Sequence, residues 1–90
     1  MSKDSLLDLL RDILGELKKL QDERAEDYLH SIIISYEKVI DMLVMDEFPE
    51  NLIKSSPREY LEIYSDYENP LLDKMDFAQK QLSLFIGGQP

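Results

Sequence analysis

The fold is decided by residues 4–45, which read DSLLDLLRDILGELKKLQDERAEDYLHSIIISYEKVIDMLVM. In the first half of this stretch, apolar residues recur at steps of three and four, which places them along one face of an α-helix. They are Leu6, Leu7, Leu10, Ile13, Leu14, Leu17 and Leu20. The spacing predicts a helix over about residues 4–19. Gly15 lies inside it at a cost of about 1 kcal/mol relative to alanine, so we expect a neighbouring backbone to approach closely there.

The second half of the stretch carries another apolar stripe with the same period, which predicts a helix over about residues 22–45. Its members are Ala25, Leu29, Ile32, Tyr36, Val39 and Leu43, with Tyr28, Ile33 and Ile40 at its edges. At 100° per residue, the centres of the two stripes lie roughly 110° apart, so one straight helix would present two unrelated faces. We therefore expect a tight break near Gln21 and Asp22, with Asp22 as the N-cap. A single rod that forms a coiled-coil dimer is the alternative.

Residues 46–55 are expected to form a connection, because Pro49 ends any helix before it, and Phe48, Leu52 and Ile53 are expected to attach it to the core. Two helix starts follow. Ser56 and Pro57, with Glu59 three residues after the serine, are typical of an N-terminal cap and predict a helix over 57–65. Asn69 and Pro70 predict another over 70–85, which Gly87 and Gly88 end.

These elements predict an all-α protein, a small four-helix bundle with a short third helix in one domain over residues 1–86, followed by a tail over 87–90. With 43% hydrophobic and 32% charged residues, the chain is too apolar for a disordered acidic tail. It has no apolar run long enough to span a bilayer and no cysteine, and its first residues do not resemble a secretory signal peptide. We expect a cytoplasmic protein without membrane contact or cofactor.

The net charge of −9 is unevenly distributed along the chain. Acidic and basic residues balance over residues 1–20 and over 69–90, whereas residues 21–68 hold 13 acidic and 4 basic residues and all five tyrosines. Such a surface steers cationic partners. It argues against direct nucleic-acid binding, which requires clustered Lys and Arg. We expect a basic partner protein.

The second predicted helix carries the first set of candidate partner-binding residues. On the face opposite its apolar stripe lie Glu23, Glu26, Asp27, Ile34, Glu37 and Asp41. One interpretation is an anchor, Ile34, that enters a pocket of the partner while the surrounding acids attract a basic surface. The other is a solvated acidic face with one stray isoleucine.

The second set lies around the short third helix. It consists of Tyr60, Glu62, Tyr64, Asp66 and Tyr67. Tyrosine offers a large, stiff contact area at low entropic cost and is common in binding surfaces. The alternative is that Tyr60 and Tyr64 pack on the neighbouring helices.

Catalytic and metal sites are poorly supported by the sequence. His30 is the single histidine, with Glu26 and Asp27 at helical spacing, which is an incomplete ligand set. No glycine-rich phosphate loop or nucleophile–base pair is recognisable. We expect no enzymatic activity. Phe77 and Leu84 project away from the main stripe of the last helix, where the chain covers them or a second copy does.

The acidic residues of the second helix and Tyr60, Tyr64 and Asp66 give this chain a layout that resembles the small acidic immunity proteins, which protect bacteria from their own nuclease bacteriocins. The resemblance implies a distorted four-helix bundle that inhibits a basic toxin. The chain departs from that family in having Tyr60 and Tyr64 four residues apart instead of an adjacent tyrosine pair. Our main hypothesis is a non-enzymatic protein-binding module that exists as a monomer or homodimer, and its most specific version is such an inhibitor. The alternative is a small, self-associating structural subunit.

Overall fold

The protein forms four helices, which a computed structural model describes over residues 2–24, 27–47, 50–64 and 68–87. They are α1 (Lys3–Arg24), α2 (His30–Val44), α3 (Ser56–Tyr64) and α4 (Pro70–Ile86). Every regular element within these ranges is helical. The predicted all-α, four-helix bundle with a short third helix is therefore confirmed.

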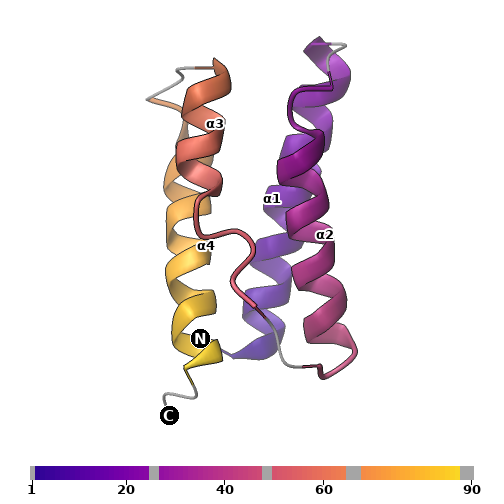
Figure 1. Cartoon of the computed structure of the whole chain (residues 1–90), viewed down its shortest axis with the longest axis vertical. Coiled ribbons are helices and arrows are strands. Elements are labelled where there is room, and N and C mark those ends of the chain that lie inside the picture. The colour runs from indigo at the N-terminus through magenta and orange to yellow at the C-terminus, as the bar shows by residue number, and fades with distance from the viewer. Residues whose placement is uncertain (1, 25–26, 48–49, 65–67, 88–90) are drawn as a thin grey trace.

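The helices are packed in a ring in which α1 contacts α2 and α4, and α3 contacts α4 and α2. α1 and α3 both finish at the upper end in Figure 1, whereas α2 and α4 both finish at the lower end. α3 covers only the upper half of the bundle, and the connection between α2 and α3 crosses the lower half (Figure 1). The two ends of the molecule therefore present different sets of chain segments.

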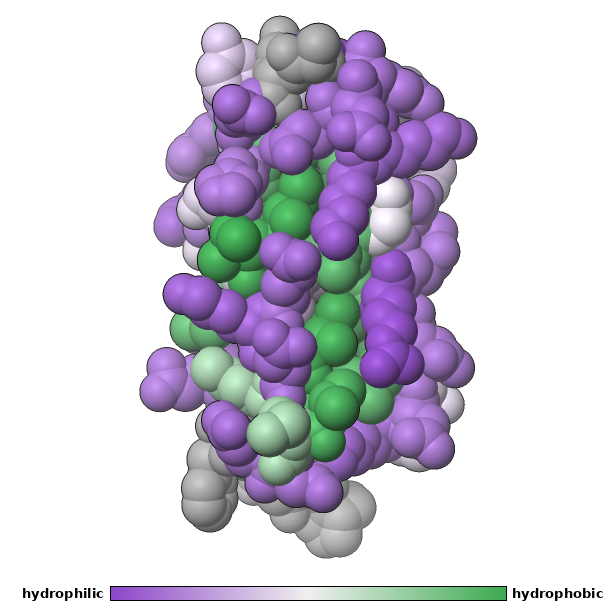
Figure 2. Space-filling view, turned by 90° about the vertical axis from the view of Figure 1, so that its right-hand side faces the viewer, coloured by the Kyte–Doolittle hydropathy of each residue, from purple (hydrophilic) through white to green (hydrophobic). Residues whose placement is uncertain are grey.

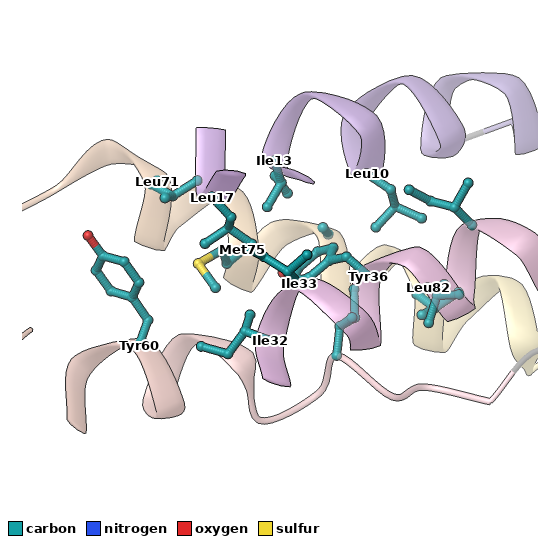
Figure 3. Close-up of a cluster of buried hydrophobic side chains, with 14 of the residues drawn as sticks. Leu10, Ile13, Leu17, Ile32, Ile33, Tyr36, Tyr60, Leu71, Met75 and Leu82 are labelled. Carbon is teal, nitrogen blue, oxygen red and sulfur yellow. The ribbon is translucent and has the colours of Figure 1, made fainter. Parts of the chain in front are cut away.

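The core fills the space between the four helices with aliphatic side chains and two tyrosines. Figure 3 shows residues from all four helices pointing into this space. The largest fully buried side chains are Tyr36, Tyr60, Leu6, Leu10, Ile13, Leu17, Leu29, Ile32, Leu43, Ile53, Met75 and Leu82. Burial of such side chains is the main source of the folding free energy, at about 1.5–3 kcal/mol each.

The expected break at Gln21 and Asp22 is wrong. α1 continues to Arg24, and α2 begins only at His30. Asp22 is therefore a helical residue and caps nothing, while the N-cap of α2 is Leu29, which makes no side-chain cap hydrogen bond. Leu29 is fully buried, so hydrophobic packing sets the place where α2 begins. The chain turns back between α1 and α2, which excludes the single rod.

The start of α3 is displaced by one residue from the predicted cap. The Ser55 hydroxyl donates to the Glu59 carboxylate over 2.8 Å, and the Glu59 N–H donates to the Ser55 carbonyl over 2.9 Å. Ser56, the expected cap, is buried and hydrogen-bonded to Tyr36. The start of α4 is as predicted, because the Asn69 side chain accepts a hydrogen bond from the Leu71 N–H over 2.9 Å and Pro70 follows the cap.

The connection between α2 and α3 is attached to the bundle by one buried residue and one polar residue. Ile53 is fully buried, as expected, and Leu52 packs against the core, whereas Phe48 lies outside the described residues. The Asn51 side-chain amide donates to the Gln79 carbonyl over 2.9 Å and to the Ser83 hydroxyl over 2.6 Å. These two bonds hold the connection against α4.

Two further expectations are corrected. A Cβ atom added to Gly15 would meet nothing within 4 Å, so no backbone approaches there and the glycine has no packing role. Tyr28, which was expected at the edge of the core stripe, is 64% exposed. It lies in the turn before α2, where the helical period on which the expectation depended does not apply.

Candidate protein-binding surface

Exposed carboxylates gather at the end of the bundle where α1 and α3 finish. The last turn of α1, the turn before α2, the last turn of α3 and the residue before the α4 cap all contribute to this end (Figure 1). We call it the acidic end and define it by six exposed residues, Asp22, Glu23, Asp27, Tyr28, Glu62 and Glu68. Tyr28 is the one exposed large hydrophobic or aromatic side chain of the described residues at this end.

A cation–π contact joins the two sides of the acidic end. The guanidinium carbon of Arg24, at the end of α1, lies 4.1 Å from the centroid of the Tyr64 ring, at the end of α3. Tyr64 in turn meets Tyr60 edge to face, with ring centroids 5.5 Å apart and an interplanar angle of 64°. Arg24 therefore contributes a positive charge within the acidic end while it holds the ends of α1 and α3 together.

The predicted tyrosines have different environments. Tyr60 is 0% exposed and accepts a hydrogen bond from the Asn69 side chain over 3.2 Å. The expectation that it belongs to an accessible surface is wrong, because the short α3 must use its inward face to fill the core beside α4 (Figure 3). Tyr64 is half-buried. Tyr67 and Asp66 lie outside the described residues.

The predicted acids of the second helix are not brought together. Asp27 and Asp41 are both exposed, but they are separated by 14 residues along the α2 direction, which corresponds to roughly 20 Å. Glu37 lies 3.5 Å from the Lys18 ammonium group and Glu23 lies 4.0 Å from that of Lys19. Glu26 lies outside the described residues.

Ile34 does not stand out as an exposed anchor. It is half-buried, on a helix whose neighbouring Glu37 faces Lys18 of α1. Figure 2, which shows one side of the bundle, has hydrophobic atoms in a strip between hydrophilic side chains. Ile34 is not among the partly buried side chains that pack against the core, so its role as an anchor stays a prediction.

A shallow cavity of about 230 Å³ adjoins the acidic end. It lies between the last turns of α1 and the beginning of α4, with the apolar side chains of Leu20 and Leu71 and the carboxylates of Glu16 and Glu23 in its wall. Lys74 of α4 binds Glu16 over 2.9 Å and Asp12 over 3.0 Å, and these hydrogen bonds raise the pKa of the Lys74 ammonium group. The ion pairs attach α4 to α1 beside the cavity.

No metal-binding group of three or more His, Cys, Asp or Glu side chains occurs among the described residues. His30 and Asp27 are both exposed. The His30 backbone N–H donates a hydrogen bond to the Asp27 carbonyl over 3.1 Å. In the parts of the chain that the structure describes, no helix combines the length and apolar character needed to cross a bilayer.

Three members of the acidic end, Asp22, Tyr28 and Glu68, were missed in the sequence. The signal that could have found the first two is the run from Asp22 to Asp27, in which five of six residues are charged. A run with so many charges favours a solvated helix end and turn. Tyr28 follows it directly and is exposed with it.

Comparison with known proteins gave no significant match, whether to a protein-family model, a curated protein or a solved structure. The resemblance of this chain's layout to that of immunity proteins therefore stays a prediction.

Proposed function

We propose that this chain is a non-enzymatic protein-binding module that engages a basic partner protein through its acidic end. The observation that supports this proposal is the gathering of five exposed carboxylates around an exposed Tyr28 where two turns of the bundle meet. Surface charges of one sign raise the association rate with a cationic partner. Tyr28 supplies apolar contact area and a hydroxyl group at short range.

The most specific form of the proposal is an immunity protein or inhibitor that neutralises a cationic toxin in the cytoplasm. A toxin that acts on nucleic acid carries a basic surface, and an acidic protein that covers this surface blocks it. The immunity role further requires that the partner be toxic to cells that lack this chain. Growth of cells that express the partner with and without this chain tests that requirement.

The test begins with a partner captured from the native host. Its rate of association with this chain is then measured at about 50 and about 300 mM salt, where screening differs strongly. We expect the association rate to fall steeply with salt. The double variant Asp27→Asn, Glu62→Gln should slow association and reduce the salt dependence. Asp4→Asn, Asp8→Asn is the matched control, because it removes the same number of exposed charges from the first turns of α1, at the opposite end of the bundle.

The variant Tyr28→Ser tests the short-range contact with the partner separately from electrostatic steering. It should accelerate dissociation by about tenfold, as expected for loss of an aromatic interface residue worth about 1.4 kcal/mol, and leave the salt dependence unchanged. An acidic or neutral partner whose binding is insensitive to salt would refute the proposal.

A self-associating structural subunit is the second candidate function, and the exposure of Phe77 and Leu84 favours it. These side chains are 46% and 53% exposed and lie seven residues apart, on the same side of α4. A homodimer through this side would cover both. Sedimentation at micromolar concentration distinguishes the two candidates, since a tight dimer that Leu84→Ser dissociates supports the second.

A further inference from the structure

Large exposed apolar side chains gather at the end of the bundle opposite the acidic end. Of the seven such side chains in the described residues, five lie at the C-terminal ends of α2 and α4. We call this set the apolar end, and its members are Val44, Met45, Leu84, Phe85 and Ile86. Met45 is the most exposed, at 68%. Both helices finish at the lower end in Figure 1.

A cavity of about 210 Å³ joins the two helix ends. Leu43 of α2, Phe85 of α4 and Lys3 of α1 contribute to its wall, together with Asp46 and Glu47, which follow α2. On the side shown in Figure 2, the hydrophobic strip continues into the lower part of the molecule. The cavity therefore borders the apolar end at Phe85, where a side chain of another molecule can insert.

The charges around this cavity are mainly negative. Asp46 and Glu47 lie in its wall, and Asp41 is exposed one helical turn before Met45. Lys3 forms an ion pair with Asp46. Neither α2 nor α4 has a basic residue in its last turn, so the partial negative charge of each helix C-terminus, about half an elementary charge, adds to the carboxylates.

We propose that the apolar end is a second docking site, which binds a segment of a partner protein that carries apolar side chains flanked by Lys or Arg. A basic amphipathic helix has this chemistry. Charge complementarity selects this occupant, because a second copy of the chain would bring the same carboxylates against each other and an anionic lipid surface would be repelled. The inference is independent of the acidic end, which lies at the other end of the bundle.

The probe is a synthetic amphipathic helix of Leu and Lys, compared with a scrambled peptide of identical composition. Both peptides have the same charge, so their difference in affinity reports the apolar contact. We expect the whole chain to bind the amphipathic peptide at least about tenfold more tightly, and Val44→Ser, Met45→Ser to abolish the difference. Phe77→Ser is the matched control, because Phe77 is exposed but lies two turns before the end of α4.

Charge is tested separately with Asp41→Asn, Glu47→Gln, which should weaken binding of both peptides and reduce its salt dependence. Equal affinity for the two peptides, or an unchanged difference in Val44→Ser, Met45→Ser, would overturn the inference. So would a dimer of the unmodified chain that the same variant converts to a monomer, because the occupant would then be a second copy. None of these outcomes bears on the Tyr28 variant, so the two proposals can fail separately.

Discussion

The hydroxyl oxygens of Tyr36 and Ser56 lie 2.9 Å apart inside the core, where they form a hydrogen bond between α2 and the first residue of α3. Tyr36 is fully buried, and Ser56 is the one buried polar residue in the described parts of the chain. Neither hydroxyl group has access to water, so each depends on the other for a hydrogen-bond partner. Because its hydroxyl group is bonded to Tyr36 inside the core, Ser56 does not act as the expected cap of α3.

Removal of both members of this pair should destabilise the protein by less than the sum of the two single removals. Tyr36→Phe and Ser56→Ala should each cost about 1–3 kcal/mol, because each leaves the other hydroxyl buried without a partner. The double variant should cost less than the sum of the two, which a double-mutant cycle from urea unfolding measures. Strict additivity would show that the hydrogen bond contributes nothing to stability.

Tyr36 should also make the protein sensitive to high pH. Burial raises the pKa of its phenol above the ordinary value because the charged form is poorly solvated in the core. The unfolded chain therefore loses this proton first, at about pH 10, so the contribution of Tyr36 to stability is complete below that pH and is lost as pH rises above it.

The measurement is the free energy of unfolding at pH 9 and at about pH 11, compared between the unmodified protein and Tyr36→Phe. We expect the variant to lose less stability over this interval. Identical losses would mean that Tyr36 does not titrate differently in the two states.

Gly15→Ala should stabilise the protein by about 0.5–1 kcal/mol. Gly15 is an exposed residue inside α1, and an added methyl group meets no atom, so the substitution reduces the entropy of the unfolded chain without a steric cost. Urea unfolding followed by circular dichroism measures the gain, and Gly15→Ser should give a smaller one. A destabilised alanine variant would reveal a close contact in solution.

Local signals predicted much of this fold, as α4 illustrates. The Asn69–Pro70 start needs only a side-chain acceptor and a fixed backbone angle, and both are properties of adjacent residues. The boundary between α1 and α2 could not be placed in this way. Asp22 is as good a cap in isolation as any residue of the turn, but the burial of Leu29, which depends on the other helices, decides where α2 begins.

The candidate site was less predictable than the fold for a related reason. A helical projection shows that Tyr60 and Tyr64 share a side of α3, but not whether that side meets the core or the solvent. In the structure the two tyrosines differ in exposure, because Tyr60 is buried whereas Tyr64 is half-buried beneath Arg24. The acidic end joins segments far apart in the chain, and only the antiparallel arrangement of the helices brings Asp27 and Glu62 to the same end.

The contact between Arg24 and Tyr64 should contribute modestly to stability and hold the acidic end in shape. Tyr64→Leu and Arg24→Gln should each cost about 0.5–1 kcal/mol, the usual value of an exposed cation–π contact. Arg11→Gln is the matched control, because Arg11 is an exposed arginine of the same helix and should have a smaller effect. The coupling between Arg24 and Tyr64, obtained from a double-mutant cycle, isolates the contact from the change in net charge.

The same contact has a spectroscopic signature. A guanidinium group 4.1 Å from a ring centroid lies within the ring current of the tyrosine, so the side-chain proton resonances of Arg24 should shift upfield and return to ordinary positions in Tyr64→Leu. If the resonances do not move and the coupling energy is zero, the ends of α1 and α3 are not held together in solution. The carboxylates of Glu23 and Glu62 would then have no fixed spacing to offer a partner, so this measurement tests the geometric premise of the acidic end without requiring the partner.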